Sequence, residues 1–97
     1  MNNVIGRRVH CYEEMQAPGD FLWTGCEAGD QPPGRLMFIC PCGCGMTCGI
    51  AIAGDRTLHP VWDWNGDFEK PSVNPSIRML SGCQWHGYLT DGVFRSC

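Results

Sequence analysis

The sequence has little that would suit a membrane protein or a nucleic-acid-binding protein. No apolar run among its 97 residues reaches the ~20 residues that a membrane span needs. The opening stretch "MNNVIGRRVHCYEEM" lacks the continuous apolar segment of a signal peptide. The seven Lys and Arg residues are scattered and form no basic stripe that could follow a phosphate backbone. We therefore predict a cytoplasmic protein that contacts neither membranes nor nucleic acids.

Segments that favour helices are also scarce, and turn signals are frequent. Turn-forming sequences such as Pro18-Gly19-Asp20, Asn65-Gly66-Asp67 and Asp91-Gly92 recur at short intervals. Between them lie compact apolar runs at 35–39, 49–53, 60–64, 76–80 and 88–94, and only 12–16 could form a short helical turn. The pattern predicts a mainly β fold, a small antiparallel β domain that occupies residues 1–97 as one unit. Residues 36–97 are expected to form the core of this domain, with residues 1–35 as an N-terminal extension packed on it.

The C-terminal run predicts a specific β-hairpin. If Asp91-Gly92 is a two-residue turn, the strand register follows from it. Facing residues are then Thr90 and Val93, Leu89 and Phe94, Tyr88 and Arg95, and at the open end His86 and Cys97. Leu89 and Phe94 would share the face of the hairpin that turns toward the core.

Eight cysteines in so short a chain indicate a metal site that staples the domain. A domain of this size buries too little surface to be very stable without a cross-link or a metal. Cytosolic thiols stay reduced, so metal binding is favoured over disulfides. The sequences "CPCGCG" and "CQWHG" each supply ligand residues from one turn, which suits the tetrahedral thiolate and imidazole coordination of zinc.

The candidate ligands outnumber the four positions of a zinc ion. The favoured set is Cys40, Cys42, Cys83, His86 and Cys97, with Cys44 as a sixth candidate, and the sequence leaves open which four bind. The other three cysteines, Cys11, Cys26 and Cys48, are expected to be buried core residues, because free cysteine often behaves as a small apolar side chain.

The two cysteine motifs resemble the two cluster-binding loops of Rieske proteins. The stretch "CQWHGYLTDG" is similar to their second loop and "CPCGCG" to their first. The resemblance implies that Cys40 and Cys83 form one ligand pair, while Cys42 and His86 stand at the positions of the two histidines. A Rieske cluster needs both histidines on one iron. Since Cys42 replaces one of them, a single zinc ion fits better, and an iron–sulfur redox protein is the alternative.

A second resemblance covers residues 36–97. The succession "CPCGCG", "WDWNG", "KPSVNPSI", "CQWHG" and "DGVFRSC" is similar to a family of small uncharacterised proteins that is common in bacteriophage genomes and is sometimes labelled ammonia monooxygenase. This resemblance implies a phage-type, zinc-binding domain with no assigned reaction.

The motifs of a catalytic zinc site are missing. No H-x-E or H-E-x-x-H element places a carboxylate beside a ligand, and the surplus of cysteines favours a closed structural site. We therefore predict a binding module that acts on a protein partner, and not an enzyme. The more specific interpretation is a phage-encoded, anti-CRISPR-like inhibitor of a host defence complex, located in the host cytoplasm.

The segment "WDWNGDFEK" is the predicted contact surface for that partner. Its candidate contact residues are Trp62, Trp64, Asp67 and Glu69, because aromatic side chains flanked by polar groups are enriched in binding hot spots. The alternative is that Trp62 and Trp64, two residues apart on a strand, share one face and pack on the core.

Overall fold

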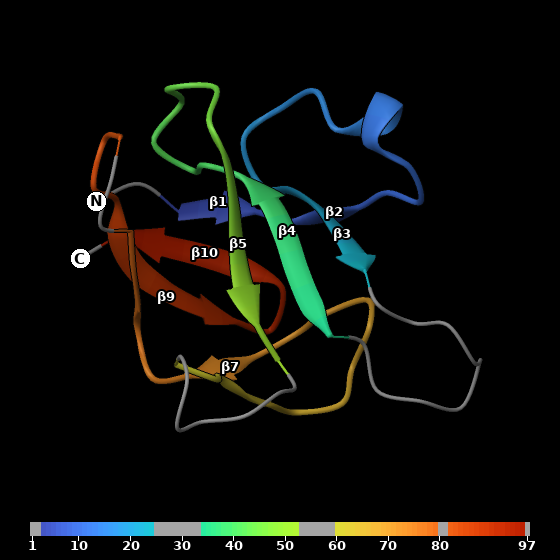
Figure 1. The fold of residues 1–97 in the computed structure, drawn as a ribbon, viewed down its shortest axis with the longest axis vertical. Coiled ribbons are helices and arrows are strands. Elements are labelled where there is room, and N and C mark those ends of the chain that lie inside the picture. Colours follow the sequence, from blue (N-terminus) through green and yellow to red (C-terminus); the bar gives the residue numbers. More distant parts are fainter. Residues whose placement is uncertain (1–2, 25–33, 53–59, 80–81, 97) are drawn as a thin grey trace.

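The computed structural model describes residues 3–24, 34–52, 60–79 and 82–96. Its fold is mainly β and largely antiparallel, as the turn pattern predicts (Figure 1). Sheet A contains, in spatial order, β1 (Asn3–Ile5), β10 (Val93–Ser96), β9 (His86–Thr90) and β8 (Ile77–Arg78). Sheet B contains β2 (Arg7–Arg8), β3 (Asp20–Thr24), β4 (Arg35–Ile39) and β5 (Thr47–Ala51). No helix in the described ranges is long and apolar enough to cross a membrane.

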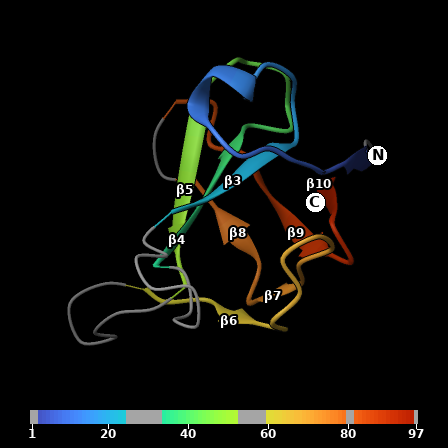
Figure 2. The same cartoon turned by 90° about the vertical axis from the view of Figure 1, so that its right-hand side faces the viewer.

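Two smaller elements complete the described chain. The strands β6 (Asp63–Trp64) and β7 (Val73–Asn74) form a separate antiparallel pair. A single 3-10 turn, η1 (Tyr12–Glu14), lies within the predicted helical turn at 12–16. Figure 2 shows β6 and β7 at the end of the molecule opposite η1.

The C-terminal hairpin has the predicted register. Thr90 faces Val93, Leu89 faces Phe94, and Tyr88 faces Arg95. The turn residues Asp91 and Gly92 both have positive φ angles, of 50° and 74°, as this type of two-residue turn requires. Leu89 and Phe94 are fully buried. The last described pair is Gly87 with Ser96, and the predicted partner of His86, Cys97, lies outside the described residues.

The N-terminal part of the chain supplies strands to both sheets. In sheet A, β1 pairs with β10, so that Val4 faces Phe94. In sheet B, β2 runs parallel to β3, while β3, β4 and β5 are antiparallel. The core of the domain therefore draws on strands from both ends of the sequence.

An ion pair between the exposed side chain of Arg7 and the buried carboxylate of Asp20 links β2 to β3. The Arg7 guanidinium donates from Nε and Nη2 to the two carboxylate oxygens of Asp20, at 3.0 and 2.9 Å. The Asp20 Oδ2 atom also accepts the backbone N–H groups of Gln16 and Ala17, both at 3.0 Å. The bond from Arg7, together with these two amides, lowers the pKa of Asp20 to about 2.

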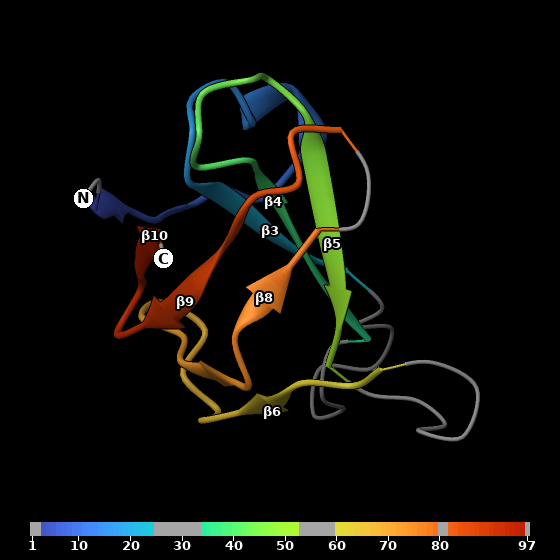
Figure 3. The same ribbon diagram turned by 90° about the vertical axis from the view of Figure 1, so that its left-hand side faces the viewer.

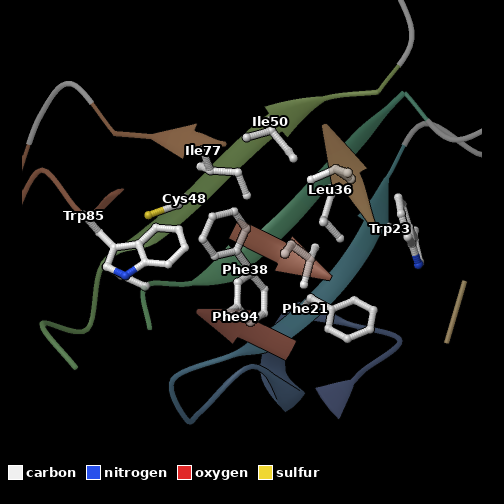
Figure 4. Close-up of a cluster of buried hydrophobic side chains, with 12 residues drawn as sticks. Phe21, Trp23, Leu36, Phe38, Cys48, Ile50, Ile77, Trp85 and Phe94 are labelled. Carbon is white, nitrogen blue, oxygen red and sulfur yellow. The ribbon is translucent and has the colours of Figure 1, made fainter. Parts of the chain in front are cut away.

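The core lies where the inner faces of the two sheets meet (Figure 4). Alternate residues of each strand point inward, as the two-residue period of a strand dictates. The central residues are fully buried side chains from five strands, namely Phe21, Leu36, Phe38, Ile77, Leu89 and Phe94. The rings of Phe38 and Phe94 join the sheets, with their centroids 5.0 Å apart.

The tryptophans of the predicted contact segment pack on this core. Both Trp62 and Trp64 are half-buried and lie against it. The Trp64 ring is 4.8 Å from that of Trp23 and 4.8 Å from that of Phe68. The expectation that both side chains pack on the core is confirmed, and their role in contacting a partner stays a prediction.

The acidic residues of the same segment are exposed. The Asp67 carboxylate accepts the backbone N–H groups of Glu69 and Lys70, at 2.9 and 3.0 Å, and so shapes the turn. Glu69 pairs with Arg8 at 2.9 Å. The role of Asp67 and Glu69 in binding a partner stays a prediction.

Candidate metal centre and serine–histidine pair

The first cysteine loop begins where β4 ends. Its turn is closed by hydrogen bonds from the Cys40 N–H to the Met46 carbonyl, at 2.8 Å, and from the Gly43 N–H to the Cys40 carbonyl, at 3.2 Å. Gly43 and Gly45 have φ angles of 92° and 84°, which favour glycine. The loop folds back on itself, and its three alternating cysteines gather on one side.

The second cysteine loop connects β8 to β9. Cys83 lies between Gly82 and Gln84, whose φ angles of 65° and 56° are both left-handed. Figure 3 shows this loop beside the loop between β4 and β5, at the same end of the molecule. The two motifs recognised in the sequence are therefore neighbours in the fold.

Four cysteine sulfurs converge between these loops. The Sγ atoms of Cys40, Cys42, Cys44 and Cys83 all lie within 4.8 Å of one another. Cys83 is central, with its Sγ 3.2 Å from those of Cys40 and Cys42 and 3.4 Å from that of Cys44. These cysteines are free thiols. A tetrahedral ion with Zn–S bonds of ~2.3 Å separates its sulfurs by roughly 3.7 Å, so the cluster is of the right size and donor type for one metal ion.

The pKa values of two thiols in the cluster, Cys40 and Cys83, are shifted in opposite directions. Hydrogen bonds, first from Cys42 and then from Cys40 and Cys44, lower the pKa of Cys83 to about 7. Burial raises the pKa of Cys40, which is fully enclosed. Because a metal ion binds thiolates, Cys83 is more readily available as a ligand than Cys40, and closing the site on a metal must release the proton of Cys40.

The cluster contains some of the predicted ligands. Cys40, Cys42 and Cys83 come together, and the sixth candidate, Cys44, joins them. Among the described residues, His86 is not part of this group. Cys97 lies outside the described residues.

The remaining cysteines divide between the core and the surface. Cys48 is buried in the core, as expected. The same expectation is wrong for Cys11, which is exposed at the start of η1, where Glu14 provides a local hydrogen-bond partner. Cys26 lies outside the described residues.

His86 instead contacts a serine. Its Nε2 atom is 3.1 Å from the Oγ of Ser76. In the register of β8 and β9, Arg78 faces His86, so Ser76 is the diagonal neighbour of His86, on the same face of sheet A. His86 is exposed and Ser76 half-buried, so a molecule in solution can reach the pair.

The position of the Ser76 backbone is fixed by a hydrogen bond to its carbonyl and by the burial of the next residue. The indole N–H of Trp62 donates to the Ser76 carbonyl at 3.2 Å. The next residue, Ile77, is fully buried in the core. The sequence analysis did not identify Ser76. The only available signal was a serine at the start of a predicted strand, beside Pro75.

A comparison with protein families assigns the chain. Residues 8–97 match the model of a family described as the bacterial ubiquitination-like system serine protease, BubE. The chain belongs to the BubE family. No curated protein and no solved structure matches this BubE chain. The family is bacterial by its description, which gives no support to a phage origin or to an anti-CRISPR role.

The cysteine cluster and His86 of this BubE chain are close together in the sequence. Cys83 belongs to the cluster, and His86 begins β9 only three residues later. Between them, Trp85 is buried and donates from Nε1 to the Ser96 hydroxyl at 2.9 Å. The segment that carries His86 is therefore fixed at one end by the cluster and in the middle by the core.

Proposed function

We propose that this chain is a serine protease of a bacterial ubiquitination-like system, with Ser76 as the nucleophile and His86 as the general base. The observation that carries the proposal is the 3.1 Å contact between Ser76 Oγ and His86 Nε2 on an accessible face. A hydroxyl paired with an imidazole is the minimum arrangement for an activated serine. The family description supplies the reaction class.

The reaction follows from this geometry in two stages. His86 Nε2 takes the proton of Ser76 Oγ as that oxygen attacks the carbonyl carbon of the substrate amide. The tetrahedral intermediate collapses, the amide C–N bond breaks, and the imidazolium returns the proton to the leaving amine. A water molecule, activated by His86, then hydrolyses the Ser76 ester and releases the carboxylate product.

The cysteine cluster is proposed to hold one structural zinc ion. Four thiolates fill all four positions of a tetrahedral site and leave none for a substrate, which is the arrangement of structural zinc. The all-cysteine group also suits zinc better than a Rieske cluster, which needs two histidines. Zinc would supply a fixed link between the loop at Cys40–Cys44 and the loop at Cys83, and so hold His86 in place.

The test is loss of amide hydrolysis in two single variants. The substrate is the ubiquitin-like modifier of such a system, joined through its C-terminus to a fluorescent protein, and release of that protein is measured. Ser76→Ala and His86→Ala should each lower kcat/KM by about 10³-fold or more, as in other serine proteases. Ser76→Ala should also abolish labelling by a fluorophosphonate probe.

Ser72→Ala is the matched control. Ser72 lies four residues from Ser76, and its hydroxyl accepts the backbone N–H of Asp91 at 2.8 Å, away from His86. This variant should keep both hydrolysis and labelling. Full activity in Ser76→Ala, with the control also active, would disprove the assignment of the nucleophile.

A further inference from the structure

Sheet A has a second, outward face that carries the serine–histidine pair. In a strand, alternate side chains share a face, and residues that face each other across two strands point the same way. The register of β1, β10, β9 and β8 therefore places Ile5, Arg95, Tyr88 and Arg78 on the face that carries Ser76 and His86. The opposite face, with Phe94, Leu89 and Ile77, is the buried one. These six outward residues are called the outer face below.

The outer face exposes large apolar side chains. Ile5 is 80% exposed and Tyr88 is 49% exposed. Only one other large apolar residue in the described part of the chain is exposed, Tyr12 on η1. Single exposed apolar residues are normal on protein surfaces. Here two of the three lie on one sheet face, together with the proposed nucleophile.

The charge of the outer face is opposite in sign to that of the whole chain. The protein has a net charge of −3, yet the strand positions of this face hold Arg78 and Arg95 and no Asp or Glu. In the described ranges, the salt bridges of arginine are those of Arg7 with Asp20 and of Arg8 with Glu69. Arg78 and Arg95 thus have no carboxylate partner within this part of the chain.

We propose that the outer face is the docking surface for the substrate protein, the ubiquitin-like modifier, and that the modifier binds it through apolar side chains flanked by carboxylates. This inference rests on the proposed function. Ile5 and Tyr88 supply apolar contact, while Arg95 and Arg78 pair with the carboxylates, because charges across an interface are complementary. Three strand spacings separate β1 from β8, or roughly 14 Å. A folded modifier seated over β1 and β10 would therefore need a C-terminal tail that crosses about this distance to reach Ser76.

The test measures KM for the modifier fused through its C-terminus to a fluorescent protein. Ile5→Ser and Arg95→Glu should each raise KM about tenfold, since truncation of a central contact commonly costs that much affinity. For the protein without substitutions, KM should rise as the NaCl concentration increases from about 50 to 500 mM, because salt screens the charges at the interface. In Arg95→Glu, KM should depend much less on the NaCl concentration. Matched controls are Tyr12→Ser, another exposed aromatic residue, and Arg35→Glu, an exposed arginine on β4 of sheet B. Both should keep the original KM.

Each outcome decides between the docking surface and the proposed function. If Ser76→Ala is inactive but Ile5→Ser and Arg95→Glu keep the original KM, the docking surface is wrong and the protease assignment stands. If Ser76→Ala keeps full activity, the proposed function is wrong, and the docking proposal that rests on it is wrong too. Sedimentation velocity tests whether the outer face instead binds a second copy of the chain. A dimer of the original chain that becomes a monomer in Ile5→Ser would overturn the proposal. Circular dichroism of each variant confirms that the exposed substitutions leave the fold intact.

Discussion

Replacing Asp20 by Asn should destabilise the fold in a way that depends on pH. Only 2% of Asp20 is exposed, and its carboxylate accepts two bonds from Arg7 and one each from the amides of Gln16 and Ala17. Asparagine has nearly the same shape, but it carries no charge and offers only one acceptor oxygen. The variant therefore leaves Arg7 without its ionic partner.

The magnitude follows from the pKa of Asp20. A fall from the ordinary value of 3.8 to about 2 corresponds to ~2.4 kcal/mol of folding free energy. Because the folded-state pKa is the lower one, this contribution is fully present above pH ~4 and is lost as the pH falls toward 2. We expect Asp20→Asn to be about 2 to 3 kcal/mol less stable than the original chain at pH 7. The difference between the two proteins should shrink in acid.

Urea unfolding of both proteins at several pH values between 7 and 2.5 measures this difference. Protonation of the cysteine ligands in acid weakens any metal site in both proteins alike, so the comparison uses the pH values at which both proteins still unfold cooperatively. A stability difference that stays constant down to pH 2.5 would refute the reasoning, since it would show that the charge of Asp20 contributes nothing to folding.

Two further substitutions test the cluster and the support of Ser76. Elemental analysis should find about one zinc per chain. Cys83→Ser should lose this zinc and leave the protein unfolded, because a structural zinc site contributes on the order of ten kcal/mol. The exposed Cys11→Ser should keep both the zinc and the melting temperature. Equal melting of the two variants would mean that the cluster is not structural. Trp62→Phe removes the indole N–H that donates to the Ser76 carbonyl; it should cost about 1 kcal/mol in thermal unfolding and lower kcat more than it raises KM. An unchanged kcat would show that Trp62 does not position Ser76.

Local sequence signals predicted the parts of the fold that depend on neighbouring residues. The turn at Asp91-Gly92 determines its own register, so the pairs from Thr90 with Val93 outward could be derived. The cysteines at 40, 42 and 44 lie in one tight loop, so they are close together in space whatever the position of that loop in the fold. Local signals could not predict the pairing of β1 with β10 or the parallel pairing of β2 with β3, because these strands are not joined by a short turn in the sequence.

The serine–histidine pair could not be derived for a different reason. A C-x-x-H spacing permits His86 to turn toward the metal, and the residues alone do not say which way it points. The left-handed backbone at Gln84 and the burial of Trp85 place His86 at the start of β9, where its side chain contacts Ser76, the residue just before β8. Ser76 had no motif of its own, since a nucleophile of this kind is defined by its neighbours in space. The C-x-x-H spacing also placed His86 among the candidate ligands, whereas the cluster found in the described residues consists of four cysteines.

The pairing of β1 with β10 means that the outer face can be completed only after the C-terminal strand β10 has been synthesised. Val4 and Phe94 face each other across the sheet although 90 residues separate them in the sequence. Contacts of such high sequence separation form late in folding, because the intervening chain must first lose its freedom. During synthesis, Ile5 leaves the ribosome long before the strand that carries Phe94 exists. The outer face carries Ile5 at one edge of sheet A and Ser76 and His86 toward the other edge. It is thus completed only when β10 docks between β1 and β9, so we expect a nascent chain to lack the assembled outer face.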